Sequence, residues 1–223
     1  MPAGVLSFMH TKPSSYRTSV SSLAAAVAVA ASIVLSAQAP VPAQGPAGLQ
    51  TPEQFAGHRI GADNKLVRWD RIVDYMTLVS KSSDRVRLRE LGKSTNGEPF
   101  IALEISAPAT LKDLDRYKAL ERKLYFQGGA PTAAERDEIF REGKAVVLVT
   151  CSIHATEIGA SQTVLELVHR LATEDSPTVK KILDNVIFIL VPSLNPDGQI
   201  MITDWFNKNL GTCLLYTSPS PRD

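Results

Sequence analysis

The chain has 223 residues, of which 44% are hydrophobic, and a formal net charge of +1. This is enough apolar material for the core of one ordinary domain together with a targeting segment. Basic and acidic residues are spread along the whole chain, so no basic stripe or acidic tail favours contact with nucleic acid. Composition therefore indicates a globular protein and points away from nucleic acid as a partner.

The N-terminal region has the order of a secretory signal. His10, Lys12 and Arg17 precede an apolar stretch, residues 23–39, which ends in small residues. This sequence of basic, apolar and small-residue regions is typical of a signal peptide, so we expect residues 1–43 to direct export to the periplasm or the extracellular space. The apolar stretch is only slightly shorter than the about 20 residues that span a bilayer, so an uncleaved membrane anchor is the alternative.

The folded domain is expected over residues 61–212, after a linker at residues 44–60 that is rich in Pro, Gly, Ala and Gln. From residue 64, apolar side chains recur at three- and four-residue intervals as far as Val79, which predicts the first helix.

A strand pair is predicted next. Residues 86–91 and 100–105 flank a turn signal at Asn96-Gly97, and their composition predicts two antiparallel strands. Residues 111–124 then have helical spacing.

A further helix has clear signals at both ends. Thr132 lies three residues before Glu135, as in a capping box, and Gly143 is expected to end the helix.

The second half of the domain is predicted to form a strand, a helical connection and a second strand. Residues 145–152 and 186–193 are short apolar, β-branched runs, which predicts two strands buried on both faces. Helices are predicted at residues 158–173 and 177–185 between them. A connection of this length predicts a parallel crossover, so the fold class is α/β with a mixed sheet.

Polar residues follow both of these strands. In an open α/β sheet, ligands bind outside the carboxyl ends of the strands, so residues 152–157 and 193–198 should lie on the same rim. His154 offers an imidazole nitrogen and Glu157 a carboxylate oxygen, and both suit zinc at ~2.0–2.2 Å. An H-x-x-E pattern also occurs by chance, with the histidine as a hydrogen-bonded structural residue, so the spacing alone leaves both interpretations open.

Three other features are given structural roles. Cys151 lies in an apolar run and is expected to pack as a small hydrophobic residue, because a nucleophilic thiol needs an exposed electropositive setting. His169 is expected on a helix surface and not at a metal. The N-P-D-G sequence of residues 195–198 is a good local turn, since Pro fixes φ and Gly permits positive φ.

Three elements in this order carry a resemblance to a known family. Residues 91–106, residues 151–160 (C-S-I-H-A-T-E-I-G-A) and residues 190–198 (L-V-P-S-L-N-P-D-G) together resemble the N-terminal part of the zinc metallocarboxypeptidase family, of the carboxypeptidase A and B type. The resemblance spans roughly residues 64–212. It implies a truncated phosphorylase/hydrolase-like carboxypeptidase fold, in which a mostly parallel mixed sheet has helices on both faces.

The resemblance also implies a function. His154 and Glu157 match the family's H-x-x-E, which implies that both are ligands of a catalytic Zn²⁺. The implied activity is zinc-dependent hydrolysis of a peptide or peptide-like substrate at or near its C-terminus, in which zinc polarises the carbonyl and activates a water molecule.

The chain lacks the rest of the family's site. The family's second histidine ligand and its general-base glutamate lie far beyond H-x-x-E, and residues 199–212 contain no arginine to hold a substrate carboxylate. His10, His58 and His169 are not well placed to substitute. The resemblance therefore implies a third ligand and a general base beyond the end of this chain, and an inactive fragment. No catalytic residue is assigned, and the substrate-binding residues stay unknown.

The last residues differ from everything before them. Residues 213–223, C-L-L-Y-T-S-P-S-P-R-D, resemble a translated sequencing adapter, which predicts a non-native tail. A natural disordered tail is the alternative.

Two other functions fit the same motif. An N-acyl amino acid deacylase of the aspartoacylase and desuccinylase type looks similar around H-x-x-E, and a non-catalytic carboxypeptidase-like binding domain would also keep it. Export and the element at residues 92–106 favour the peptidase over the deacylase. Whether a later histidine ligand and glutamate base exist would decide between enzyme and binding domain.

Overall fold

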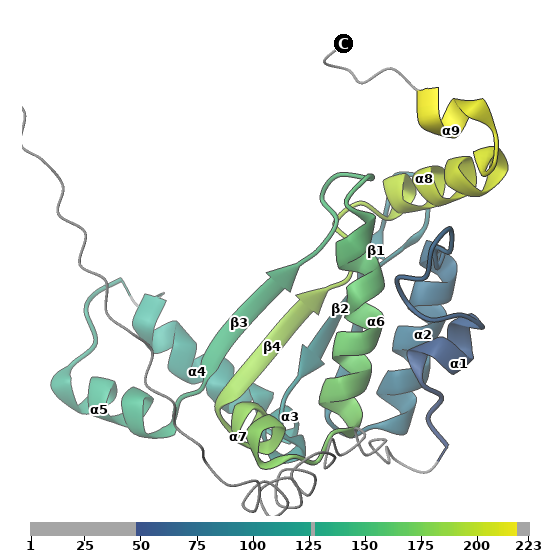
Figure 1. Ribbon diagram of the computed structural model, residues 1–223. Coiled ribbons are helices and arrows are strands. Elements are labelled where there is room, and N and C mark those ends of the chain that lie inside the picture. The colour runs from purple at the N-terminus through teal and green to yellow at the C-terminus, as the bar shows by residue number, and fades with distance from the viewer. Residues whose placement is uncertain (1–47, 126–127, 218–223) are drawn as a thin grey trace, which may run out of the picture. The chain divides into compact units, whose positions relative to one another are not determined.

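A computed structural model describes residues 48–125 and 128–217 of the chain (Figure 1). The predicted signal peptide at residues 1–43 and the last six residues of the tail lie outside these described residues. Within them, the strands form a four-stranded sheet in the order β1-β2-β4-β3. No helix in the described part of the chain is long and apolar enough to cross a membrane.

The predicted strand pair is confirmed. β1 (Val86–Lys93) and β2 (Pro99–Ile105) pair antiparallel, with an irregularity in register between Glu90 and Gly92. Gly97 has a φ of 89°, a left-handed conformation that glycine adopts without a steric penalty, so the predicted Asn-Gly turn forms between the strands.

The first long helix begins later than its apolar spacing predicts. α2 (Trp69–Ser82) starts after Arg68, whose φ of −72° and ψ of 156° are extended. Asn64 has a φ of 60°, which no helix interior allows, so the segment before Arg68 is irregular and the predicted start at residue 64 is wrong. A short helix, α1 (Pro52–Ala56), precedes this segment.

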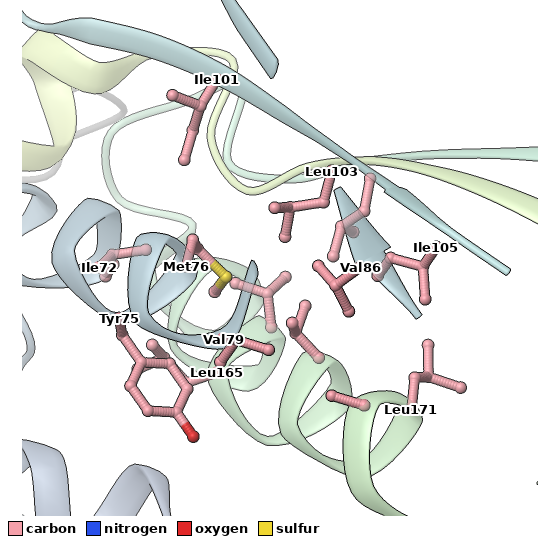
Figure 2. Packing of buried hydrophobic residues seen from close by; sticks show 14 of the residues in the cluster. Ile72, Tyr75, Met76, Val79, Val86, Ile101, Leu103, Ile105, Leu165 and Leu171 are labelled. Carbon is pink, nitrogen blue, oxygen red and sulfur yellow. The ribbon is translucent and has the colours of Figure 1, made fainter. Parts of the chain in front are cut away.

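The main core lies between α2 and one face of the sheet. Ile72, Met76 and Val79 are fully buried against side chains of β2 and of α6 (Ile158–Thr173) (Figure 2). The indole nitrogen of Trp69 donates to the carbonyl of Pro99 at 3.0 Å, which ties the start of α2 to the start of β2.

The predicted crossover is confirmed. β3 (Ala145–Thr150) is followed by α6 and α7 (Pro177–Asn185), and the chain returns in β4 (Val186–Val191), parallel to β3. α6 covers the same face of the sheet as α2, and β3 and β4 end at the same rim (Figure 1).

Two expectations about the sheet need correction. The sheet is mixed as predicted, but β1 pairs antiparallel with β2 and β2 antiparallel with β4, so only the β3·β4 pair is parallel among the described strands. A tight turn between β1 and β2 forces their antiparallel pairing, whereas a helical crossover permits parallel strands. β3 was expected to be buried on both faces, yet it lies at the edge of the described sheet and most of its residues are exposed.

The opposite face of the sheet carries a smaller cluster. α3 (Pro108–Lys112) and α4 (Leu114–Tyr125) replace the single helix predicted at residues 111–124, and Leu111 and Leu114 pack on Ile187 of β4. α5 (Ala133–Glu142) has the predicted Thr132 capping box and ends at Gly143. Helices therefore lie on both faces, as predicted.

The N-P-D-G sequence opens a helix that the turn prediction missed. Asn195 is the N-cap and Pro196 the first residue of α8 (Pro196–Asn209), which suits a proline because the first helical turn needs no N–H partner. A short helix, α9 (Cys213–Thr217), follows in the segment predicted to be a non-native tail.

One buried amide ties the start of the domain to α6. The side chain of Gln162 accepts from Val67 N at 2.8 Å and donates to Val67 O at 2.9 Å. Both ends of the amide are thus paired although Gln162 is only 5% exposed.

Candidate metal centre

The two polar loops lie on one rim of the sheet, as predicted. Cys151 N donates to Val191 O at 3.0 Å, and Leu194 N donates to Cys151 O at 2.8 Å. These bonds continue the parallel β3·β4 ladder beyond the strands. The H-x-x-E loop and the start of α8 are therefore neighbours at the carboxyl ends of the two strands (Figure 1).

Cys151 belongs to the core and not to the site. It is buried among the main cluster of apolar side chains. Burial raises the pKa of its thiol, which disfavours the thiolate that a nucleophile needs. The predicted packing role is confirmed.

The loop between β3 and α6 turns sharply at Ser152. This residue has a φ of 49°, an uncommon left-handed conformation for a residue other than glycine. Its hydroxyl donates to Glu157 O at 2.8 Å, and Glu157 N donates to His154 O at 3.1 Å. The loop is thus folded back on itself, which brings positions 154 and 157 together.

His154 and Glu157 face one another. The ring Nδ1 of His154 lies 2.9 Å from Glu157 Oε1, and the backbone N–H of His154 donates to Glu157 Oε2 at 3.1 Å. Hydrogen bonds from the imidazole and the backbone of His154 hold the pKa of the Glu157 carboxyl below its usual range. Glu157 is therefore a carboxylate at neutral pH, which is the form that binds a metal.

The donor set suits zinc but is incomplete in the described chain. A nitrogen and a carboxylate oxygen are both zinc ligands, and side-chain exposures of 75% for His154 and 45% for Glu157 leave them accessible to an ion. Among residues 48–125 and 128–217, however, no group of three or more His, Cys, Asp and Glu could hold a metal. The pair could hold zinc in part, as two of its ligands.

His169 does not complete the pair. It lies in the last third of α6, eleven residues after Ile158, which is about 16 Å along the helix axis. Burial lowers the pKa of its imidazole, which is half-buried on the helix. His169 is thus less exposed than the sequence predicts, and its lack of a metal role stays a prediction.

Sequence reasoning missed two contacts that surround the pair. Asp197 accepts from Ser94 Oγ at 2.5 Å and from Asn96 N at 3.2 Å, which joins α8 to the β1–β2 turn. Asn195 Nδ2 donates to Ile153 O at 3.4 Å, beside His154. The sequence predicts a local turn at N-P-D-G and another at Asn96-Gly97, but nothing in either signals that they meet.

The known proteins that this chain resembles are carboxypeptidases or are named after them. The sequence profile of the zinc carboxypeptidase family matches residues 72–212, more than half of the chain. A curated relative, an inactive metallocarboxypeptidase, ecm14, from Talaromyces marneffei, is 33% identical over 81 residues, which cover 35% of this chain and 13% of the relative.

Solved structures of carboxypeptidases also match this chain. A metallo-carboxypeptidase from Burkholderia cenocepacia is 27% identical with a TM-score of 0.40, over 59% of this chain and 28% of that one. Carboxypeptidase A from Helicoverpa armigera is 19% identical with a TM-score of 0.42, over 73% of this chain and 33% of that one. The chain thus spans about a third or less of these relatives. By its match over residues 72–212, the chain belongs to the zinc carboxypeptidase family.

Proposed function

We propose that the protein represented by this chain is a zinc-dependent metallocarboxypeptidase that hydrolyses peptide bonds at or near a free C-terminus. The observation that carries the proposal is the convergence of His154 Nδ1 and Glu157 Oε1, 2.9 Å apart, at the carboxyl end of β3 in a chain of this family. Family membership supports hydrolase, metalloprotease and carboxypeptidase chemistry with zinc and a peptide substrate.

The described residues have a defined part in this chemistry. Zinc, when bound, would polarise the scissile carbonyl and lower the pKa of a water molecule. His154 would contribute a neutral imidazole and Glu157 a carboxylate. The hydrogen bond from the Ser152 hydroxyl to the Glu157 carbonyl holds the loop closed. The backbone of both proposed ligands is therefore ordered before an ion binds. Such prior ordering reduces the entropy that metal binding must overcome.

The remaining groups are proposed to lie outside residues 1–212. Catalytic zinc sites have three protein ligands, and the pair supplies two. We therefore propose that the third ligand and the general base belong to a longer protein, of which residues 1–212 are the N-terminal part. The 223-residue chain should then bind zinc weakly and hydrolyse peptides little or not at all.

A second function has one observation in its favour. The curated relative at 33% identity is named an inactive metallocarboxypeptidase. A non-catalytic carboxypeptidase-like binding domain that keeps its fold is therefore the other candidate.

The test uses the longer protein encoded at the same locus. Purified protein should contain one zinc by elemental analysis and release C-terminal residues from a peptide in a chelator-sensitive way, and His154→Ala should abolish both. Zinc-free protein without hydrolysis would reject the peptidase. Bound zinc or retained peptide affinity without hydrolysis would instead support the binding domain.

Export remains a separate proposal. The basic residues and the apolar stretch at residues 23–39 support a signal peptide, with a membrane anchor as the alternative. N-terminal sequencing of the protein recovered outside the cytoplasm tests this, since a start near residue 44 indicates cleavage, and an intact Met1 in the membrane fraction indicates an anchor.

A further inference from the structure

The side chain of Asn195 is used at both of its polar ends. Its Oδ1 accepts from Gly198 N at 2.9 Å and so caps α8, while its Nδ2 donates to Ile153 O at 3.4 Å. A Cβ atom at Gly198 would lie 2.6 Å from Asn195 Nδ2, so glycine at this position leaves the space that the amide occupies. The amide is therefore seated between α8 and the H-x-x-E loop.

The contact from Asn195 is distinctive among the loop's bonds. Residues 152–157 make their other side-chain hydrogen bonds among themselves, from Ser152 and between His154 and Glu157. Within residues 48–125 and 128–217, the bond from Asn195 is the one hydrogen bond that joins residues 152–157 to an element other than α6. It reaches the carbonyl immediately before His154.

The start of α8 is itself held in place. Asp197 accepts two hydrogen bonds from the β1–β2 turn, at Ser94 and Asn96. Two residues later, the buried Gln199 accepts from Ser161 Oγ of α6 at 3.0 Å. A side chain that extends from this helix start therefore extends from a fixed point, not from a mobile loop.

We propose that Asn195 is a positioning residue for the metal centre, which holds the backbone before His154 so that the His154 and Glu157 side chains converge. The claim that the positioned side chains bind a metal rests on the proposed function, whereas the claim that Asn195 holds the loop does not. Asn195 acts through Ile153 O, and its side chain makes its hydrogen bonds to Ile153 and Gly198 and not to His154 or Glu157, so we assign it no role as a ligand or catalytic residue.

Two substitutions separate this role from helix capping. Asn195→Ser and Asn195→Asp both keep an oxygen that can cap α8, since Ser, Asp and Asn are comparable N-caps. Neither keeps the amide donor to Ile153 O, and Ser adds no charge. Asn185→Asp is the matched control, because it removes a similar side-chain bond, to Lys181 O at 2.8 Å, at the end of α7.

The first measurement needs no metal. Backbone amide exchange of His154 and Glu157, whose N–H groups are bonded within the loop, should be about threefold to tenfold faster in both Asn195 variants, the effect of losing one modest hydrogen bond. Thermal unfolding should fall only slightly and to a similar extent in all three variants, and exchange at positions 154 and 157 in Asn185→Asp should match that of the unmodified chain. Unchanged exchange at positions 154 and 157 in both Asn195 variants would overturn the proposal.

The second measurement adds Zn²⁺ to the 223-residue chain and follows the His154 imidazole by NMR. Apparent zinc affinity should fall about threefold to tenfold in both Asn195 variants and not in the control. Equal affinity in all variants would overturn the metal part of the proposal. Faster exchange in the variants, with no zinc effect on His154 even in the unmodified chain, would keep the positioning role and reject the zinc assignment instead.

Discussion

The two faces of the sheet use the same kinds of residue with opposite outcomes. Where α2 and α6 cover the sheet, Leu103 of β2 and Leu165 of α6 are at most 1% exposed. On the face toward α4, Leu148 of β3 is 62% exposed and Val146 is 43% exposed. Apolar composition therefore does not decide burial here. What decides it is whether a helix lies over the strand.

The two edges of the described sheet differ as well. β1 carries Arg87, Arg89 and Glu90 and has an irregular register, which are features that discourage pairing with another strand. β3 has the sequence A-V-V-L-V-T, with no charge, no proline and no irregularity. The β1 edge is thus protected against further strands, whereas the β3 edge is open to them.

A pair of leucine truncations should show the contrast between the faces most strongly. Leu165→Ala removes a fully buried side chain and should lower the free energy of unfolding by about 2–5 kcal/mol. Leu148→Ala makes the same chemical change at an exposed position and should stay within about 0.5 kcal/mol. Denaturant unfolding of both variants measures this difference, and equal losses would contradict the assignment of the two faces.

A smaller effect is expected in α5, on the less covered side. Only Ile139 of this helix is buried, so its N-terminal capping box is a large share of its stability. Thr132→Ala should destabilise the helix by about 1 kcal/mol. Hydrogen exchange at residues 133–142 should rise while the main unfolding transition does not move. A loss of global stability of the same size would mean that α5 is coupled to the core.

An ion pair beside the well-packed face should contribute less again. Arg68 contacts Asp204 through Nε at 2.8 Å and Nη2 at 3.1 Å, and these hydrogen bonds lower the pKa of the Asp204 carboxyl. A lowered pKa in the folded state stabilises the fold above about pH 4, the ordinary Asp pKa, and that contribution is lost as pH falls through the folded value.

Asp204→Asn should therefore cost about 0.2–1 kcal/mol at pH 7, as for other exposed ion pairs. The difference between Asp204→Asn and the unmodified chain should disappear in strong acid. Urea unfolding at several pH values would check this, and a difference that does not depend on pH would show that the carboxylate charge is not responsible.

The smallest stability effect is expected at the β3 edge, where the change should appear in association instead. Leu148→Lys should alter the free energy of unfolding by less than about 0.5 kcal/mol because the side chain is exposed. We expect the unmodified chain to self-associate as its concentration rises and the lysine variant to do so less, since a lysine discourages edge pairing. Light scattering during size-exclusion chromatography distinguishes the two, and identical monomeric profiles would contradict the expectation.

Local signals in the sequence were sufficient for much of the fold. The Thr132 capping box and the periodic apolar residues of α6 predict elements that the structure contains with nearly the same bounds. Features set by distant contacts were not predictable in this way. The exposure of β3 depends on which strands lie beside it, and a six-residue apolar run reads the same in the centre and at the edge of a sheet.

In the candidate site, too, local features could be predicted and long-range contacts could not. His154 and Glu157 are three residues apart, so their convergence follows from one short loop and could be predicted. The contacts of Asn195 with Ile153 and of Asp197 with Ser94 join residues 42 and 103 positions apart. No periodicity or spacing rule connects such positions, so the surroundings of the pair required the folded structure.

The paired amide of Gln162 has a consequence for how the domain forms. Its two hydrogen bonds with Val67 join positions 95 residues apart, and closing so long a segment is entropically costly before other contacts exist. The segment that precedes α2 should therefore dock only after α6 has packed on the sheet. In a refolding experiment, protection of the Val67 amide should develop among the last events, and a Gln162→Leu variant should mainly accelerate unfolding while leaving the folding rate nearly unchanged.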